Sequence, residues 1–244
     1  MFPGRRSAVL VGALCAGLAL AGCGGGGDPD AGTNGVAKLP PKTIEQRARD
    51  AAAAAPTVRL SGTVVSKGKT YKLDMRLRAN GGVGDVTTQS STFQLLRVGA
   101  DLYLKAGADF YGDAGAGKDS QAAAAKLKDK YVKVPAGDSA YQQFSGFTDK
   151  KVLLDALFAL NGELSTGDHR KVNGVRTIAL AADGGGGGTL DVSLEGSPYP
   201  LRYERAGGSG TLTMADWGKD FALAAPDPAH VVDYGKSVTG TSGG

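Results

Sequence analysis

The sequence predicts an α+β domain built on one large, curled antiparallel sheet with a few helices packed against it. First, apolar and polar residues alternate along many short segments, a pattern typical of strands with one buried and one wet face and therefore of antiparallel pairing. Second, turn residues separate these segments, and Asn173-Gly174 is a strong hairpin signal. Third, about nine or ten such segments occur, which is enough for one large sheet.

The alternation is clearest at 70–78, where every second residue is apolar and most of the others are charged. Lys67-Gly68 and Gly99-Ala100 are expected to be turns between neighbouring strands. Because side chains of a strand point alternately to its two faces, each segment contributes one apolar face to a common core. The other segments with this pattern are Val58–Val64, Phe93–Val98, Asp101–Lys105, Val175–Ala181 and short runs at Leu190–Leu194, Leu201–Tyr203 and Leu212–Met214.

Three stretches are expected to be helices. Thr43–Ala55 begins at a residue suited to an N-cap and is followed by Pro56, which ends it. Asp119–Lys130 is rich in alanine. Asp149–Leu160, with Thr148 as its expected N-cap, is the most apolar of the three.

The apolar residues of 149–160 cover more than one face of the expected helix. Val152, Leu153, Ala156, Leu157 and Leu160 form a stripe at helical spacing. Leu154 and Phe158 widen that stripe. A helix that is apolar nearly all round is either buried or in contact with an apolar ligand. The pattern therefore leaves two interpretations, a helix that caps the open face of the sheet and one that lines a cavity.

The N-terminus is typical of a secretory signal. Arg5 and Arg6 precede the apolar run Ala8–Leu20, which is shorter than the roughly 20 residues that a membrane span needs. Leu20-Ala-Gly-Cys23 resembles the lipobox of bacterial lipoproteins, in which the cysteine carries a lipid after cleavage. Since the only other cysteine, Cys15, lies in the removed segment, Cys23 is expected to be lipidated and to anchor the protein at the extracytoplasmic face of the plasma membrane.

The chain is therefore expected to have four parts. Residues 1–22 are the signal peptide, and residues 23–42, rich in glycine and small polar residues at their start, are the lipidated cysteine and a flexible tether. Residues 43–236 form one domain, long enough for a sizeable core. Residues 237–244 are a disordered tail.

Composition argues against several function classes. Two of the 28 Lys and Arg residues lie in the signal peptide, which leaves 26 against 24 Asp and Glu, a net charge of +2. This is too little to indicate a nucleic-acid partner. With a single cysteine in the mature chain, no disulfide, thiolate metal cluster or catalytic cysteine is expected.

No catalytic, metal or cofactor motif is complete. Gly112–Lys118 matches most of a phosphate-binding loop, but Asp119 replaces the Ser or Thr that holds Mg²⁺, so we expect a glycine-rich surface loop. His169 and His230 lack ligands in register, and the glycine run 184–188 lacks further acidic ligands. No serine lies in a nucleophile elbow. The sequence therefore predicts a protein that is not an enzyme and has no cofactor and no metal. Four further polar residues are expected to form cross-strand pairs: Glu195, Arg202, Glu204 and Arg205.

Several motifs are similar to those of the mycobacterial LppX/LprA/LprF/LprG lipoproteins. These are Val172–Thr177, Gly210–Gly218 closing at Ala225-Pro226, and Arg97–Leu104 followed by Phe110-Tyr111. The resemblance covers most of 57–226. It implies a fold similar to LolA and RseB, a curled antiparallel half-barrel that helices close on one side over a hydrophobic cavity. It also implies a carrier of lipids or lipidated glycans, with a transporter or another envelope protein as a partner to look for.

The inner apolar surface of such a sheet is either a filled core or a ligand cavity, and the sequence leaves both open. The carrier hypothesis has two alternatives, an RseB-like module that binds an envelope protein through a filled domain, and a secreted hydrolase whose nucleophile and base are not found. If the cavity exists, its lining is expected to comprise Leu73, Met75, Leu77, Leu95, Leu102, Leu104, Phe110, Leu153, Leu157, Phe158, Ile178, Leu180, Leu190, Val192, Leu194, Leu201, Tyr203, Leu212 and Met214.

Overall fold

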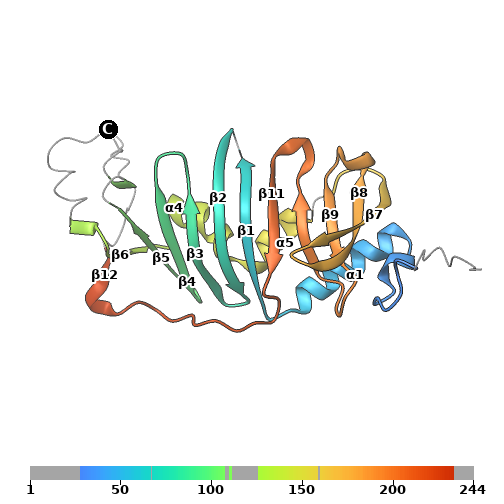
Figure 1. Cartoon of the computed structure of the whole chain (residues 1–244). Helices are drawn as coiled ribbons and strands as arrows, with labels where there is room; N and C mark the ends of the chain where they lie inside the picture. The colour runs from blue at the N-terminus through green and yellow to red at the C-terminus, as the bar shows by residue number, and fades with distance from the viewer. Residues whose placement is uncertain (1–27, 67, 108–109, 112–125, 159, 234–244) are drawn as a thin grey trace, which may run out of the picture.

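A single sheet dominates the computed structural model, which describes residues 28–66, 68–107, 110–111, 126–158 and 160–233. In the described residues the sheet has twelve strands in the order β12-β6-β5-β4-β3-β2-β1-β11-β10-β9-β8-β7 (Figure 1). The strands are β1 (Thr57–Ser66), β2 (Lys69–Arg78), β3 (Gly81–Thr87), β4 (Thr92–Val98), β5 (Asp101–Ala106), β6 (Tyr131–Val134), β7 (Leu164–Val172), β8 (Val175–Ala182), β9 (Thr189–Ser193), β10 (Pro200–Glu204), β11 (Gly210–Ala215) and β12 (Val231–Asp233).

The predicted antiparallel pairing is confirmed along almost the whole sheet. Every neighbouring pair is antiparallel except β12 with β6, which is parallel. Asn173 and Gly174 both have positive φ, 50° and 85°, as the tight turn of a two-residue hairpin requires. The sheet curls without closing, so the α+β half-barrel expected from the sequence is the architecture observed.

The register defines two edges of the sheet. Thr57 pairs with Arg78, Arg78 with Gly81, and Gly81 with Val98. β1 begins at the lower edge of the sheet in Figure 1, so the register places these residues at that edge, together with the β7–β8 hairpin and the C-terminal end of β11. The upper edge carries the opposite ends of the same strands. Residues 216–230 run along the lower edge from β11 to β12.

Three α-helices in the described part of the chain cover one face of the sheet: α1 (Pro41–Ala54), α4 (Ser139–Thr148) and α5 (Lys150–Leu157). Figure 1 shows α4 and α5 behind the strands. The buried apolar residues of all three helices belong to the same core cluster as the inward-facing strand residues. There are also four short 3-10 turns, η1 (Val36–Lys38), η2 (Asp183–Gly185), η3 (Ala206–Gly208) and η4 (Pro228–His230).

Several helix boundaries differ from those expected. α1 begins at Pro41, because a proline suits the first turn, and Thr43 is therefore inside the helix and not its N-cap. Thr148 was expected to cap α5, but it ends α4, a helix that the sequence analysis missed. Asp149 is the cap instead, and its side chain accepts a hydrogen bond from the Val152 amide at 3.0 Å. Most of the expected helix 119–130 lies outside the described residues.

The missed elements lack a clear hydrophobic period. β3 contains several glycines, and a Cβ at Gly84 would lie 2.1 Å from the Asp74 carbonyl oxygen, so close strand approach replaces side-chain packing there. β7 is an exposed edge strand with a register shift between Thr166 and His169, which interrupts any alternation. α4 buries only Ala140, Phe144 and Thr148, one residue per turn, in a sequence of weak helix formers.

Candidate functional site

Most residues expected to line a cavity lie in a packed core. Fifteen of the nineteen are at most 3% exposed and belong to one core cluster. At this burial, their side chains contact one another and the helices above them. They are Leu73, Met75, Leu77, Leu95, Leu102, Leu104, Phe158, Ile178, Leu180, Leu190, Val192, Leu194, Tyr203, Leu212 and Met214.

The other expected residues lie elsewhere. Phe110 and Leu153 are half-buried at the margin of the core. Leu201 is half-buried where the pairing of β10 with β9 shifts register, which takes it out of line with its neighbours. The side chain of Leu157 and all of Cys23 lie outside the described part of the chain, as does the loop 112–119.

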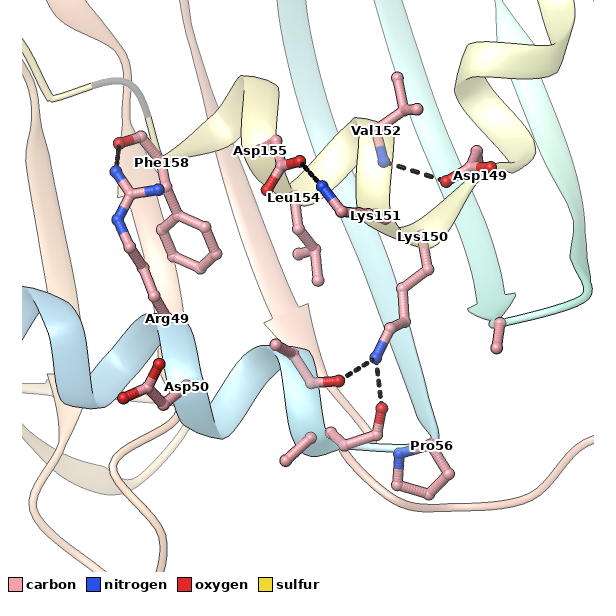
Figure 2. A pocket seen from close by; sticks show the side chains of 14 residues that line it. Arg49, Asp50, Pro56, Asp149, Lys150, Lys151, Val152, Leu154, Asp155 and Phe158 are labelled. Carbon is pink, nitrogen blue, oxygen red and sulfur yellow. Dashed lines mark hydrogen bonds and ion pairs between the residues drawn. The ribbon is translucent and has the colours of Figure 1, made fainter.

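The structure contains a large hollow between α1 and α5, which we call the α1–α5 groove (Figure 2). Its volume is about 750 Å³, within the range of small-molecule sites in proteins. Of the expected residues, it includes only Phe158. The groove is lined by Arg49, Asp50, Ala53, Ala54, Ala55, Pro56, Ala79, Asp149, Lys150, Lys151, Val152, Leu154, Asp155 and Phe158.

Small side chains leave this groove open. The last turn and a half of α1 is a run of alanines ending at Pro56, so this part of α1 has little side-chain volume facing α5. Leu154 on α5 and Phe158, the residue that caps its C-terminus, are buried, while Val152 is 54% exposed. The expected stripe is therefore wrong at Val152, whereas its members Leu153 and Leu160 are half-buried against the core. The helix is rotated so that Leu154 and Phe158, four residues apart, are the buried pair. The alanine run before Pro56 was the sequence signal for this site.

Lys150 joins the two helices at one end of the groove. It is only 8% exposed, and its Nζ donates hydrogen bonds to the carbonyl oxygens of Ala52 at 3.1 Å, Ala53 at 3.2 Å, and Ala55 (Figure 2). These are carbonyls at the C-terminal end of α1, which have no partner within the helix and favour a positive charge. Burial lowers the pKa of the Lys150 ammonium.

Three ion pairs lie at the rim of the groove. Lys151 Nζ lies 2.6 Å from Asp155 Oδ2, and Arg97 Nη2 lies 3.3 Å from Asp149 Oδ2. Arg49 pairs with Glu45 at 2.8 Å and donates to the Phe158 carbonyl oxygen. The groove therefore has an apolar floor and a rim in which each of these charges already has a partner. Such a site suits the apolar part of a ligand better than a highly charged one.

A second hollow of about 390 Å³ lies at the upper edge, between α4 and the β1–β2 and β3–β4 turns. Phe110 borders it, with its ring 5.0 Å from that of Phe93. Hydroxyl and amide groups, such as those of Ser90 and Gln143, make up much of its lining. It is smaller and more polar than the α1–α5 groove, which makes the groove the better candidate for an apolar ligand.

The polar residues considered in the sequence have structural partners. His169 Nε2 lies 2.8 Å from Asp30 Oδ1, and Arg202 pairs across the strands with the buried Asp191 at 2.7 Å. Glu195 pairs with Arg176 at 3.2 Å. Among the residues that the structure describes, no three His, Cys, Asp or Glu side chains gather where they could hold a metal ion.

No protein-family model matches the sequence, and no curated protein matches it either. The chain can, however, be compared with solved structures. LprF from Mycobacterium bovis is 16% identical, with 76% of this chain and 96% of that one covered at a TM-score of 0.52. The Mycobacterium tuberculosis lipoprotein LppX is 15% identical, with 75% of this chain and 98% of that one covered at a TM-score of 0.45. The similarity to LprF confirms the expected fold.

Proposed function

We propose that the protein is a lipoprotein, anchored through acylated Cys23 at the extracytoplasmic face of the plasma membrane, that binds and carries lipids or lipidated glycans. The α1–α5 groove is the observation that carries this proposal. Its apolar floor accommodates acyl chains, and its paired rim leaves a headgroup in water. In this proposal the protein is not an enzyme.

Two further observations support the proposal. The fold is that of LprF, and the sequence before Cys23 has the features of a lipoprotein signal. Within the described residues, none of the helices has the length and apolarity needed to cross a bilayer.

One observation favours a second candidate, a module that binds an envelope protein without carrying lipid. The core cluster buries most of the inward-facing strand residues, as a filled domain would. In that case the groove would receive a protein side chain or segment, and a transporter or another envelope protein would be the partner.

Native mass spectrometry of the mature chain carrying Cys23→Ser separates the two candidates. This variant carries no acyl chain of its own, so any lipid detected is bound as cargo. Co-purified lipid, lost when Ala53→Trp fills the groove, supports the carrier. Absence of lipid after expression in a lipid-rich host, together with no uptake from added vesicles, would contradict it.

A further inference from the structure

The connection from β11 to β12 carries an apolar segment along the lower edge of the sheet. This segment, the strap, is Phe221–Pro226, with the sequence Phe-Ala-Leu-Ala-Ala-Pro. It forms neither helix nor strand, and its three alanines are exposed. Within the described chain, the amides of residues 222–225 donate no hydrogen bond. The strap is therefore an apolar surface whose amides at 222–225 have no acceptor among the described residues.

The strap lies near the end of the α1–α5 groove that Pro56 and Ala79 line. Just before the strap, the Gly218 amide donates a hydrogen bond to the carbonyl oxygen of Thr57 at 3.1 Å. Thr57 directly follows Pro56, which lines the groove. Further on, Arg78 lies over the Phe221 ring at 5.8 Å. Arg78 is adjacent in sequence to Ala79, which also lines the groove.

An aromatic pair lies at the same edge. The rings of Tyr199 and Trp217 stack with centroids 4.9 Å apart and an interplanar angle of 6°. Both are half-buried, and Trp217 Nε1 donates to the Pro200 carbonyl oxygen at 3.1 Å. Rings of this kind, with one apolar and one polar side, favour the interface between water and lipid.

The N-terminal segment is held at this edge as well. The backbone N–H of Asn34 donates a hydrogen bond to the carbonyl oxygen of Leu194 at 2.9 Å. Its side-chain Nδ2 donates to the carbonyl oxygens of Ser193 and Gly196, both at 3.0 Å. Residues 28–34 thus contact the domain. Only four glycines separate Cys23 from Asp28, a link of about 18 Å at full extension. An acyl chain on Cys23 therefore keeps the bilayer close to this part of the domain.

We propose that the strap and the Tyr199–Trp217 pair form the surface that rests in the headgroup region of the bilayer, so that the groove opens toward the membrane. This inference rests on the acylation of Cys23 in the proposed function. Headgroup oxygens would accept hydrogen bonds from these strap amides. Two basic residues near the strap are paired, Lys219 with Asp216 at 2.6 Å and Arg78 with Asp220 at 3.6 Å. The contact is therefore interfacial and does not depend on anionic lipid.

Trp217 is the only tryptophan of the chain and reports directly on this surface. The acylated protein, produced in a bacterial host that processes lipoproteins, is reconstituted into phosphatidylcholine vesicles with and without brominated acyl chains. We expect blue-shifted emission and strong quenching by the brominated lipid. Adding phosphatidylglycerol should leave the quenching unchanged.

Two charge insertions provide a matched comparison. Ala224→Asp places a charge on an exposed strap residue and should weaken docking, seen as reduced quenching, because moving a carboxylate out of water costs free energy. Val65→Asp alters an apolar residue that is 36% exposed at the upper edge and should leave quenching as in the wild type. Equal quenching in all three proteins, or none in the wild type, would overturn the proposed surface.

Flotation of the same samples distinguishes this inference from the proposed function. If the protein floats with the vesicles but Trp217 stays unquenched, the protein is anchored and docks through another surface. This result contradicts the proposed docking surface and leaves the acyl anchor intact. Protein that fails to float is not acylated, which contradicts the anchor on which both proposals rest.

Discussion

The guanidinium group of Arg49 lies over the ring of Phe158, with Cζ 5.1 Å from the ring centroid. The same group donates a hydrogen bond to the carbonyl oxygen of Phe158. One side chain of α1 therefore holds both the ring and the backbone at the end of α5, and this contact sets the separation of the two helices across the groove (Figure 2).

Replacing Arg49 with Ala should lower the free energy of unfolding by about 1–2 kcal/mol, the sum of a partly exposed cation–π contact and one hydrogen bond. Urea unfolding measures this change. Arg47→Ala, an exposed arginine on the same helix, is the control and should change stability by less than about 0.5 kcal/mol. Equal losses in both variants would show that the contact with Phe158 contributes nothing specific.

Val192→Trp should destabilise the domain. Val192 is 0% exposed in the core cluster, and an indole ring added there forces neighbouring side chains and strands apart, at a cost of about 1–3 kcal/mol or more. Thermal melting measures this change. An unchanged or raised melting temperature would instead show that the space beside Val192 opens into a cavity and that the core is not filled.

Ala53→Trp, in contrast, should leave the stability of the domain unchanged and lower the amount of bound lipid. Ala53 is exposed in the groove, so the added ring enters solvent-accessible space and stability should stay within about 0.5 kcal/mol. Retained lipid should fall, since the ring occupies the groove floor. Lipid extraction and melting on one preparation give both results. Full lipid retention in this variant would place the ligand outside the groove.

The ion pair of Arg59 and Asp74 predicts a pH-dependent contribution. The hydrogen bond from Arg59 holds the pKa of the Asp74 carboxyl below its usual value of 3.8, so the folded state binds this proton less readily than the unfolded state. The stabilisation from this pair is therefore fully present at pH values above the pKa of Asp74 in the unfolded state. It is lost as the pH falls through the pKa of Asp74 in the folded state.

Asp74→Asn should accordingly lower stability by about 0.2–1 kcal/mol at pH 7, a small effect because both side chains are partly exposed. Urea unfolding at pH 7 and at pH 2 compares the variant with the wild type. The difference should be smaller at pH 2 than at pH 7, and an equal difference at both pH values would mean that the substitution acts through something other than the pair.

Cys23→Ser should give a folded protein that is not anchored, because the cysteine is proposed to act only through its acyl chains. Two chains make an anchor stable, whereas one binds reversibly. Metabolic labelling with a fatty acid should mark the wild type alone, and circular dichroism should be the same for both proteins. Label on the serine variant would refute the assignment of Cys23.

The sequence by itself determined the class of sheet, because side-chain alternation is a local property that pairing strands preserve. The run from Tyr71 to Leu77 already shows which residues point inward, and Asn173-Gly174 already shows where two strands reverse. Burial of Leu73, Met75 and Leu77 at 0–1% exposure follows from that pattern. Strands without this alternation, such as the glycine-containing β3, were not predicted, because their position in the sheet depends on pairing with neighbouring strands.

Only the tertiary structure decided where the hollow lies. The inner strand residues could equally have lined a cavity or filled a core, since periodicity gives the face of a residue but not the volume across from it. That volume depends on how the helices sit: α5 turns Leu154 and Phe158 down into the core, which leaves space over the alanines of α1. Lys150 and Arg49 then hold α5 against α1 through backbone carbonyls, acceptors that no side-chain pattern in the sequence can reveal.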